Sequence, residues 1–550
     1  AGTGGGPDMA HASTYLGWNY DGYYSNHLSV GGVQALKARG GKVIIIDIRD
    51  TPATKNLADI FLKINPGTDG ALALGMAKLI IDNGWMNKEY VEKYTFGFDK
   101  YKELVDQYPL DKVAEITGLD PDLIFEATKV YATNGPACTN YSASALVHHI
   151  NGFNTHRAIV CLSALTGNFD RVGGNVPNPA SYIHKPAGFP TREHQFRSEC
   201  YPKDAPERIG AEKFPLWNAL YDEFQAVDLI RQLEEGTPYP LKGMVAFGLN
   251  AKMLPQSERL LKAMADNLDF YVDTDIFMTM SAKYADLVLP ACSSLERGEM
   301  KAYQGGFLTF TQPVIEPLYD SKSDTDIMYG MIKALKLDDE LLQQGYEACC
   351  DWIIDGCGLT VADLKKSDLP VKVPAAKWPV QAGKVLANGF NTPSGKFEFY
   401  SNAIAQIVPG LDPLPSYTDP LSDENDPETK AKYPFYLCTG ARRPHALHSR
   451  THEVPWLRSL QPDPTVEVHN EDARRLGLKD GDWVAMSSPY GEIRMRVKVT
   501  ALAKPGVLLA IHGYTEANVN ELVGQNHVDP YTGFPGFKGL RCNIRKVEGK

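Results

Sequence analysis

The chain has 550 residues, of which 43% are hydrophobic, and a formal net charge of −11 at pH 7. This length exceeds what a single core accommodates and predicts roughly three or four domains. The acidic balance argues against a nucleic-acid partner, and no apolar run approaches the roughly 20 residues that span a bilayer. We therefore expect a soluble globular protein that acts on a small molecule, in the cytoplasm or exported with a cleaved signal.

The first part of the chain is predicted to alternate strands with helices. Strand and helix patterns follow one another at 14–16, 26–39, 43–47 and 71–83. The helix over 26–39 would place Leu28, Val33 and Leu36 on one face. The apolar run at 43–47 predicts a strand that is buried on both faces, as in parallel sheets. The order indicates an α/β fold with a parallel sheet.

The same alternation recurs downstream. A helix is predicted over 154–165, and strands are predicted at 245–248, 270–273 and 286–290. Between them, residues 178–215 are polar and show little periodicity, and a loop of this length is usually functional or disordered. A mixed, more helical segment follows, to about residue 432.

The composition then shifts toward short strands separated by turn residues. These strands are predicted at 435–438, 465–468, 483–487, 492–500, 506–511 and 540–547. Pro489-Tyr490-Gly491 is a candidate hairpin turn between two of them. Many short strands with such turns predict a closed β-barrel at the C-terminus.

Acids and amides follow several of the predicted strands and helices, at Asn19, Asp47, Asn168, Asn250 and Asp275. In open α/β sheets, ligands bind at the carboxyl ends of the strands. No intact G-x-G-x-x-G or G-x-x-x-x-G-K-[ST] loop is present, which argues against NAD or ATP. A carboxylate accepts two hydrogen bonds side by side, and guanine presents two adjacent donors, so these acids suit a guanine nucleotide.

Structural roles compete with this interpretation. Asp69 precedes a predicted helix, and an N-cap and a ligand contact are equally compatible with its position. Asn168 follows a helix and could be its left-handed C-terminal residue. Asp47 could be a surface acid at a strand end, although four preceding apolar residues favour burial.

The histidines and the long loop offer weaker signals. We reject His148 and His149 as a metal pair because adjacent residues face apart in regular structure. His445 and His448 could form a metal pair, but two nearby arginines make an anion contact equally compatible. In the loop, Lys185, Arg192 and His194 are the first candidates for substrate contacts, although such residues are most often solvated.

Nine cysteines are scattered along the chain without a C-x-x-C pair. An odd, scattered set predicts reduced core thiols rather than a disulfide framework. Iron–sulfur clusters require grouped cysteines, so we expect none in this chain.

The order of these signals resembles the molybdopterin oxidoreductase (dimethyl sulfoxide reductase) family, whose members bind molybdenum or tungsten between two molybdopterin guanine dinucleotides. The matching stretches are LGWNYDG (16–22), VIIIDIRDTPATKNLAD (43–59), INPGTDGALALGM (64–76), LTGNFDRVGGNV (165–176), GLN (248–250), DTDIFMTMSAKYADLVLP (273–290), ERGE (296–299), TGARRPHALHSR (439–450), VEVHNEDARRLGLKDGDWV (466–484) and NVNELV (518–523).

The resemblance implies a dinucleotide-binding α/β domain at 1–305, the remainder of a second α/β domain at 306–430, and a molybdopterin-dinucleotide-binding β-barrel at 431–550. It also implies a set of residues that contact the dinucleotides. These are Asn19, Asp47, Arg49, Asp69, Gly167, Asn168, Asn250, Asp275, Arg442, His445, His448, Ser449, Asn520 and Lys538.

Two departures from the family pattern matter. The family's iron–sulfur segment and metal-ligating residue would lie upstream of Ala1, so we expect no metal ligand in this chain and an iron–sulfur centre only in a missing segment or a partner subunit. Formate dehydrogenases of the family carry an arginine where this chain has Gly305. A formate anion in a closed site needs a fixed cation, so we predict no formate dehydrogenase activity.

The resemblance therefore implies an oxidoreductase that transfers an oxygen atom or an electron pair on a small substrate. A second hypothesis is a non-redox molybdenum or tungsten hydratase, hydroxytransferase or dehydroxylase of the same family, in which the metal acts as a Lewis acid. A third, a scaffold without cofactor, is disfavoured by the retained acids Asp47, Asp69 and Asp275.

Overall fold

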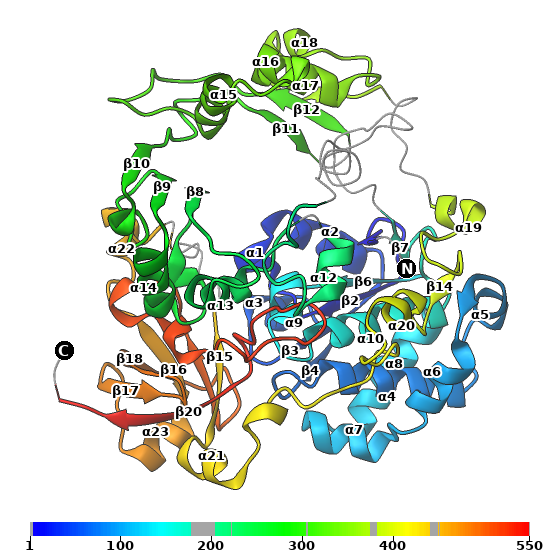
Figure 1. The fold of residues 1–550 in the computed structure, drawn as a ribbon. Helices are drawn as coiled ribbons and strands as arrows, with labels where there is room; N and C mark the ends of the chain where they lie inside the picture. Colours follow the sequence, from blue (N-terminus) through cyan, green and yellow to red (C-terminus); the bar gives the residue numbers. More distant parts are fainter. Residues whose placement is uncertain are drawn as a thin grey trace.

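The computed structural model describes residues 4–177, 204–221, 223–303, 306–374, 382–440, 449 and 451–548. Within these ranges the chain forms two parallel sheets with helices, a layer of short strands and helices, and a closed β-barrel (Figure 1). The predicted α/β class with a C-terminal barrel is confirmed.

The first sheet has the strand order β4-β3-β2-β6, and each neighbouring pair is parallel. Ile44 and Ile46 of its strand β3 belong to one buried cluster, whereas Val43 and Ile45 belong to another. Both faces of this strand are therefore covered, as its continuous apolar run predicts. The strands are β2 (Thr14–Trp18), β3 (Lys42–Asp47), β4 (Ile60–Lys63) and β6 (Ala137–Tyr141).

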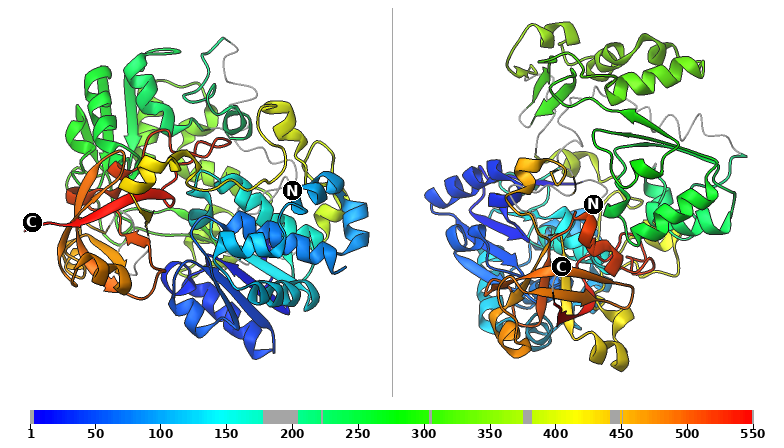
Figure 2. Two further views of the ribbon diagram at one scale, coloured as in Figure 1. Left: turned by 90° about the horizontal axis from the view of Figure 1, so that it is seen from below. Right: turned by 90° about the vertical axis from the view of Figure 1, so that its left-hand side faces the viewer.

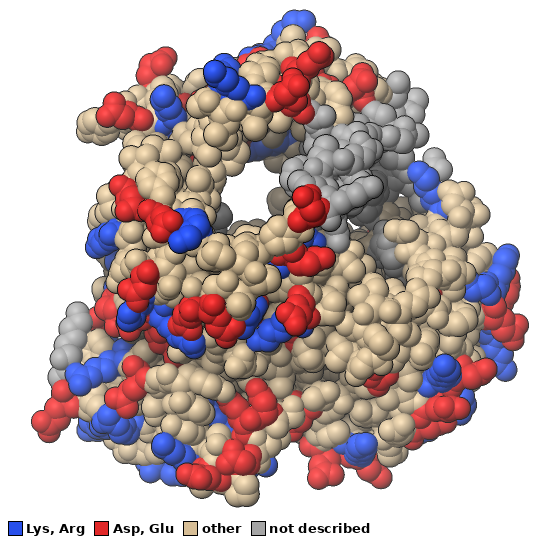
Figure 3. All heavy atoms as spheres, in the orientation of Figure 1, with Lys and Arg blue, Asp and Glu red and all other residues tan. Residues whose placement is uncertain are grey.

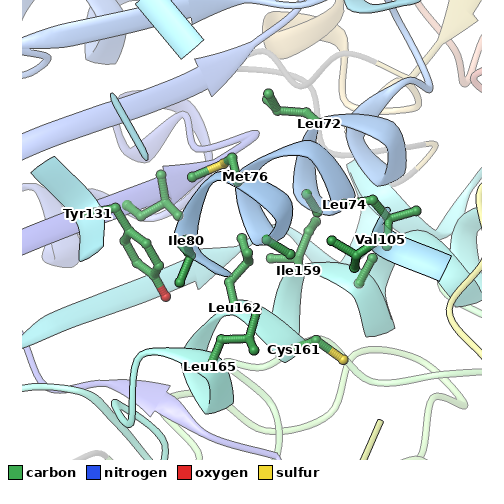
Figure 4. Packing of buried hydrophobic residues seen from close by; sticks show 14 of the residues in the cluster. Leu72, Leu74, Met76, Ile80, Val105, Tyr131, Ile159, Cys161, Leu162 and Leu165 are labelled. Carbon is green, nitrogen blue, oxygen red and sulfur yellow. The ribbon is translucent and has the colours of Figure 1, made fainter. Parts of the chain in front are cut away.

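Two buried helices, α4 (Asp69–Asp82) and α10 (Gly152–Leu165), form the centre of the larger cluster. Figure 4 shows Met76 and Ile80 of α4 close to Ile159 and Leu162 of α10. The other helices of this part are α1 (Gly22–Ser25), α2 (His27–Ala38), α3 (Pro52–Asn56), α5 (Lys88–Tyr94), α6 (Phe98–Val105), α7 (Leu110–Thr117), α8 (Pro121–Thr133) and α9 (Ala143–Val147).

The prediction that Leu28, Val33 and Leu36 share one face of α2 was wrong at Leu28. Leu28 is 94% exposed, and the helix buries Val30, Val33 and Leu36 instead. Residues of an α-helix are about 100° apart, so Leu28 points about 140° away from Val33, whereas positions three apart stay on one side.

The second sheet consists of β8 (Gly243–Phe247), β9 (Phe270–Asp275) and β10 (Leu287–Pro290), all parallel. The three strands predicted here are confirmed. Helices α13 (Leu229–Glu235) and α14 (Ser257–Asn267) cover one face of the sheet, where Tyr271 packs against Leu260 and Leu261.

A separate layer follows, at the top of Figure 1. It contains β11 (Met300–Tyr303), β12 (Phe307–Phe310), β13 (Val371–Lys372), α15 (Asp324–Ala334), α16 (Glu340–Gln344), α17 (Tyr346–Ile354) and α18 (Val361–Lys365). The chain then returns to the first α/β part, because β14 (Phe397–Glu398) pairs with β5 (Thr95–Phe96) and Phe390, Phe397 and Phe399 enter its core.

The C-terminal strands close into a barrel with the order β15-β19-β16-β18-β17-β20. Both views of Figure 2 show this barrel against the first α/β part. An isolated bridge between Arg49 and Ala503 connects the two. The strands are β15 (Phe435–Thr439), β16 (Thr465–His469), β17 (Trp483–Ser487), β18 (Glu492–Thr500), β19 (Val507–Ala510) and β20 (Leu540–Lys546).

The surface and the thiols can be described for the residues that the structure places. Figure 3 shows positive and negative side chains interspersed over the face that it draws. None of the helices among the described residues has the length and apolarity to cross a membrane. The eight cysteines that the structure describes form no disulfide, and all except Cys349 are buried, as predicted for core thiols.

Candidate functional site

A cavity of about 410 Å³ lies between the carboxyl end of the first sheet and the barrel. This is within the range of roughly 300–1,000 Å³ that holds small molecules. Its walls come from the ends of β2 and β3, the start of α4, the residues around α9, and the barrel segments after β15, after β19 and before β20. Six of the predicted contact residues line it: Asn19, Asp47, Arg49, Asp69, Asn520 and Lys538.

Asp69 connects α4 to the end of β2. It is the first residue of α4, and its N-cap neighbour Thr68 makes no side-chain cap. Asp69 Oδ1 accepts hydrogen bonds from Trp18 Nε1 at 2.7 Å and from Asn19 Nδ2 at 2.9 Å. Burial raises the pKa of Asp69, although both hydrogen bonds act to lower it. The two strand-end bonds place the Asp69 carboxyl group in the cavity wall.

Asp47 is the last residue of β3 and lies at the same sheet edge. Its Oδ1 accepts hydrogen bonds from the backbone N–H groups of Ile48, at 2.7 Å, and Arg49, at 3.3 Å. Burial raises the pKa of Asp47 to about 7, against the effect of these backbone donors. The carboxyl group can therefore gain or lose a proton near neutral pH.

Two cationic side chains, Lys538 and Arg49, line the cavity together with the acids. Lys538 Nζ donates to the Thr439 carbonyl oxygen at 2.5 Å, and burial lowers the pKa of this lysine, while the charge of Asp47 acts to raise it. The Arg49 guanidinium Nη2 lies 3.3 Å from Glu467 Oε2 of the barrel. Carboxyl and cationic groups together can bind a ligand that carries both hydrogen-bond donors and anionic groups.

The lining also contains residues that the sequence did not indicate, including both His148 and His149. His149 Nδ1 is buried and has no hydrogen-bond partner among the described residues. Burial lowers the pKa of His149 to about 3, so its ring is neutral. His148 packs on Phe534 and Phe537, with ring centroids 5.8 and 5.4 Å apart.

The missed signal was strand β6, which pairs with β2 and ends at Tyr141. The residues that follow a parallel neighbour of β2 reach the same sheet edge as Asn19 and Asp47. Recognition of β6 would therefore have placed residues 142–149 near the site. Among the described residues, no group of three or more His, Cys, Asp and Glu side chains could hold a metal.

Gly167 and Asn168 are not among the residues that line this cavity. The Asn168 side chain accepts from the Ala137 backbone N–H at 3.2 Å and donates to Thr166 Oγ1 at 2.8 Å. Gly167 has a φ of +70°, and an added Cβ would come within 2.5 Å of Asn87. In this structure both residues form the turn that ends α10.

Asn250 and Asp275 lie at the carboxyl edge of the second sheet. Asn250 follows β8, and its Oδ1 is buried without a partner among the described residues. Asp275 ends β9 and accepts from the Phe277 N–H at 3.0 Å. On the same strand, Asp273 is fully buried, and burial raises its pKa to about 6, although the Tyr271 hydroxyl and the Thr274 backbone act to lower it. The carboxyl edge of the second sheet therefore carries a second set of acid and amide groups.

The remaining predicted residues belong to segments with little structural description. Ser449 is described and is buried, with 9% of its surface exposed. The others lie outside the described residues: Lys185, Arg192, His194, Gly305, Arg442, His445 and His448.

Comparison with known proteins identifies the family. The profile described as "Molybdopterin oxidoreductase" matches residues 28–334, and the one described as "Molydopterin dinucleotide binding domain" matches 435–541. Acetylene hydratase of Syntrophotalea acetylenica is 31% identical, over 93% of this chain and 71% of that protein. Dimethyl sulfoxide reductase DmsA of Escherichia coli (strain K12) is 28% identical, over 88% of this chain and 64% of that protein.

A solved structure gives the same result. The structure of acetylene hydratase from Pelobacter acetylenicus superposes with a TM-score of 0.86 and 27% identity, over 99% of this chain and 79% of that one. The chain is thus an enzyme of the molybdopterin oxidoreductase family, in the dimethyl sulfoxide reductase group of molybdenum and tungsten enzymes, as its sequence motifs predicted.

Proposed function

We propose that the chain holds two molybdopterin guanine dinucleotides and that the complete enzyme transfers an oxygen atom or an electron pair to or from a small substrate. The observation that carries the proposal is the cavity in which Asp47, Asp69 and Lys538 converge. The second set of polar groups, at Asn250 and Asp275, supports the second dinucleotide.

The groups of the cavity suit a dinucleotide. The Asp47 and Asp69 carboxyl groups can accept the paired donors of a guanine ring, and Lys538 and Arg49 can face its phosphates. The buried, unpartnered Nδ1 of His149 is a polar atom that a ligand in this cavity can satisfy.

When bound, the metal of such a cofactor supplies the redox or Lewis-acid chemistry. The residues of this chain bind and orient the group, and the barrel wall excludes water from it. The proposal includes an iron–sulfur centre on other residues or on a partner subunit, which carries the electrons away.

Nucleotide analysis of the native enzyme tests this function. Acid extraction should release GMP at about two per polypeptide, one for each sheet edge, together with molybdenum or tungsten. Extraction of NAD or ATP without GMP would contradict the proposal, and a ratio of one would remove the second site.

The similarity to acetylene hydratase favours a second candidate, hydration or hydroxyl transfer without net redox change. The two candidates differ in electron flow. A redox enzyme reduces or oxidises an artificial dye in step with substrate, whereas a hydratase forms its product while the dye remains unchanged. Metal-replete enzyme assayed both ways separates them.

A further inference from the structure

His527 contacts the Phe537–Gly539 wall, a segment whose residues Phe537 and Lys538 line the cavity, and its side chain is fully buried. Its Nδ1 is 2.6 Å from Asp423 Oδ2, and its Nε2 is 2.6 Å from the Gly539 carbonyl oxygen. A carbonyl oxygen and an ionised carboxylate only accept hydrogen bonds. Both ring nitrogens must then donate, and only the doubly protonated imidazolium has two N–H groups.

The contact of His527 with Gly539 connects His527 to residues that line the cavity. The neighbouring Lys538 donates its backbone N–H to the His148 carbonyl oxygen at 3.0 Å and its Nζ to Thr439. A Cβ added to Gly539 would come within 3.1 Å of His149 Nδ1. The carbonyl that His527 holds therefore belongs to a segment packed against both lining histidines.

The segment that contains Gly536 and Gly539 is closely packed against His527. A Cβ at Gly536 would come within 2.5 Å of the His527 ring, so the chain passes directly over the imidazole. The opposite side is η6 (Ser422–Glu424), which supplies Asp423. His527 is thus clamped between two chain segments about 100 residues apart, and it connects them through its two hydrogen bonds.

The charged groups around His527 favour its protonated form. Burial on its own lowers the pKa of His527, but the hydrogen bond and charge of Asp423, the charge of Glu424 and the Gly539 carbonyl together raise it above its ordinary value. Burial raises the pKa of Glu424, which accepts from the Arg541 backbone N–H. On the cavity side, His149 is neutral.

We propose that His527 is a positioning residue, held as an imidazolium between Asp423 and Gly539, and that loss of its proton loosens the Phe537–Gly539 wall and releases the bound dinucleotide. A neutral ring has one donor, so one of its two contacts becomes a pair of facing acceptors. The release step rests on the proposed function, whereas the charge of His527 does not.

The charge is tested by NMR of the native enzyme with labelled histidine, in which His527→Gln identifies the resonance. We expect imidazolium signals that persist above pH 6.5, the ordinary value for histidine, and a titration at lower pH in Asp423→Asn. A neutral ring at pH 7 in the native enzyme would overturn the proposal. This measurement tests the charge of His527 whether or not the protein contains GMP. Absence of GMP would refute the proposed function and not the charge of His527.

The release step is tested by the GMP that remains bound after incubation between pH 6 and pH 9. Retention by the native enzyme should fall as pH rises through the His527 pKa, and Asp423→Asn should shift this fall to lower pH. His527→Gln should release GMP about tenfold faster than the native enzyme at pH 6. Its GMP retention should not fall further as the pH rises to 9.

The matched control is His11→Gln, which breaks the contact of the exposed His11 with Asp8 at 2.9 Å and should behave as the native enzyme. If His527→Gln fails to fold, the pH series on the native enzyme and on Asp423→Asn still tests whether His527 controls GMP retention. Retention that is independent of pH in the native enzyme and in Asp423→Asn would show that His527 does not control the wall.

Discussion

Asp69 illustrates what a single residue contributes to the site. The sequence placed it at a helix start, where a cap and a ligand contact were equally compatible, and the structure uses its Oδ1 for Trp18 and Asn19. These partners are 51 and 50 residues away in the chain, so no local pattern could predict them. Asp69 connects α4 to the end of β2 and also lines the cavity. Its substitution should therefore affect both stability and ligand binding, and the two effects can be measured separately.

We predict that Asp69→Ala lowers the GMP content of the purified enzyme and destabilises the fold by roughly 1.5–3 kcal/mol, the contribution of a charged hydrogen bond. Asp82→Ala, at the other end of α4, is the matched control, because Asp82 pairs only with a surface lysine in the described contacts. GMP analysis and chemical denaturation measure the two effects. Full GMP content with a lower denaturation midpoint would show that Asp69 is purely structural.

Asp47 gives a pH dependence whose sign follows from its burial. Its pKa is about 7 in the folded protein against 3.8 for the free group. Between these values the folded state binds more protons than the unfolded state, so the stability of the cofactor-free protein falls as pH rises from about 4 to about 7. The slope contributed by one group is at most about 1.4 kcal/mol per pH unit.

Asp47→Asn removes the titrating group, so the difference in unfolding free energy between variant and native protein should grow with pH and become constant above pH 7. Urea unfolding of the cofactor-free protein at several pH values measures it. A difference that stays the same from pH 4 to pH 8 would mean that Asp47 ionises normally.

At the scale of elements, the sequence predicted what depends on local pattern. A continuous apolar run predicted β3, and turn residues between short apolar stretches predicted the six barrel strands. β6 was missed, and with it the cavity-lining His149. Pairing of β14 with β5 joins segments about 300 residues apart, and periodicity carries no information about such partners.

The start of α10 is another contact of this kind. Its N-cap Asn151 makes no side-chain cap, but the buried Asp529 carboxylate accepts from the Phe153 N–H at 3.0 Å. It also accepts from the N–H groups of Tyr531 and Thr532. The C-terminal segment thus caps a helix of the first α/β part.

We predict that Asp529→Ala destabilises the first turn of α10 by roughly 1.5–3 kcal/mol, because several backbone donors lose a charged acceptor. Hydrogen exchange over residues 152–165 measures this local effect without assuming two-state unfolding. Asp426→Ala, which removes the exposed cap of α21 (Pro427–Lys432), should leave this exchange unchanged. Equal protection in both variants would show that α10 does not depend on the C-terminal segment.

At the scale of the whole molecule, the site exists only where the barrel meets the first sheet. Asp50 donates its N–H to the Leu502 carbonyl oxygen, and Lys504 Nζ lies 2.9 Å from Asn65 Oδ1. Arg49 reaches the barrel at Glu467, whose side chain is 1% exposed. The sequence predicted both parts, but their contact depends on pairs hundreds of residues apart, so the cavity itself could not be foreseen.

The Arg49–Glu467 pair should therefore control how firmly the two parts are joined. Loss of one partner removes the ion pair of the other buried charge, which costs roughly 3–5 kcal/mol, so Glu467→Gln and Arg49→Met should each lower stability and GMP content. The double variant should lose less unfolding free energy than the sum of the two single variants, with a coupling of roughly 0.5–3 kcal/mol.

Glu492→Gln is the control within the barrel, because its pair with Arg545 is exposed and should contribute no more than about 1 kcal/mol. Additive effects of Arg49→Met and Glu467→Gln in denaturation would show that the two side chains act independently and that this ion pair does not join the barrel to the sheet.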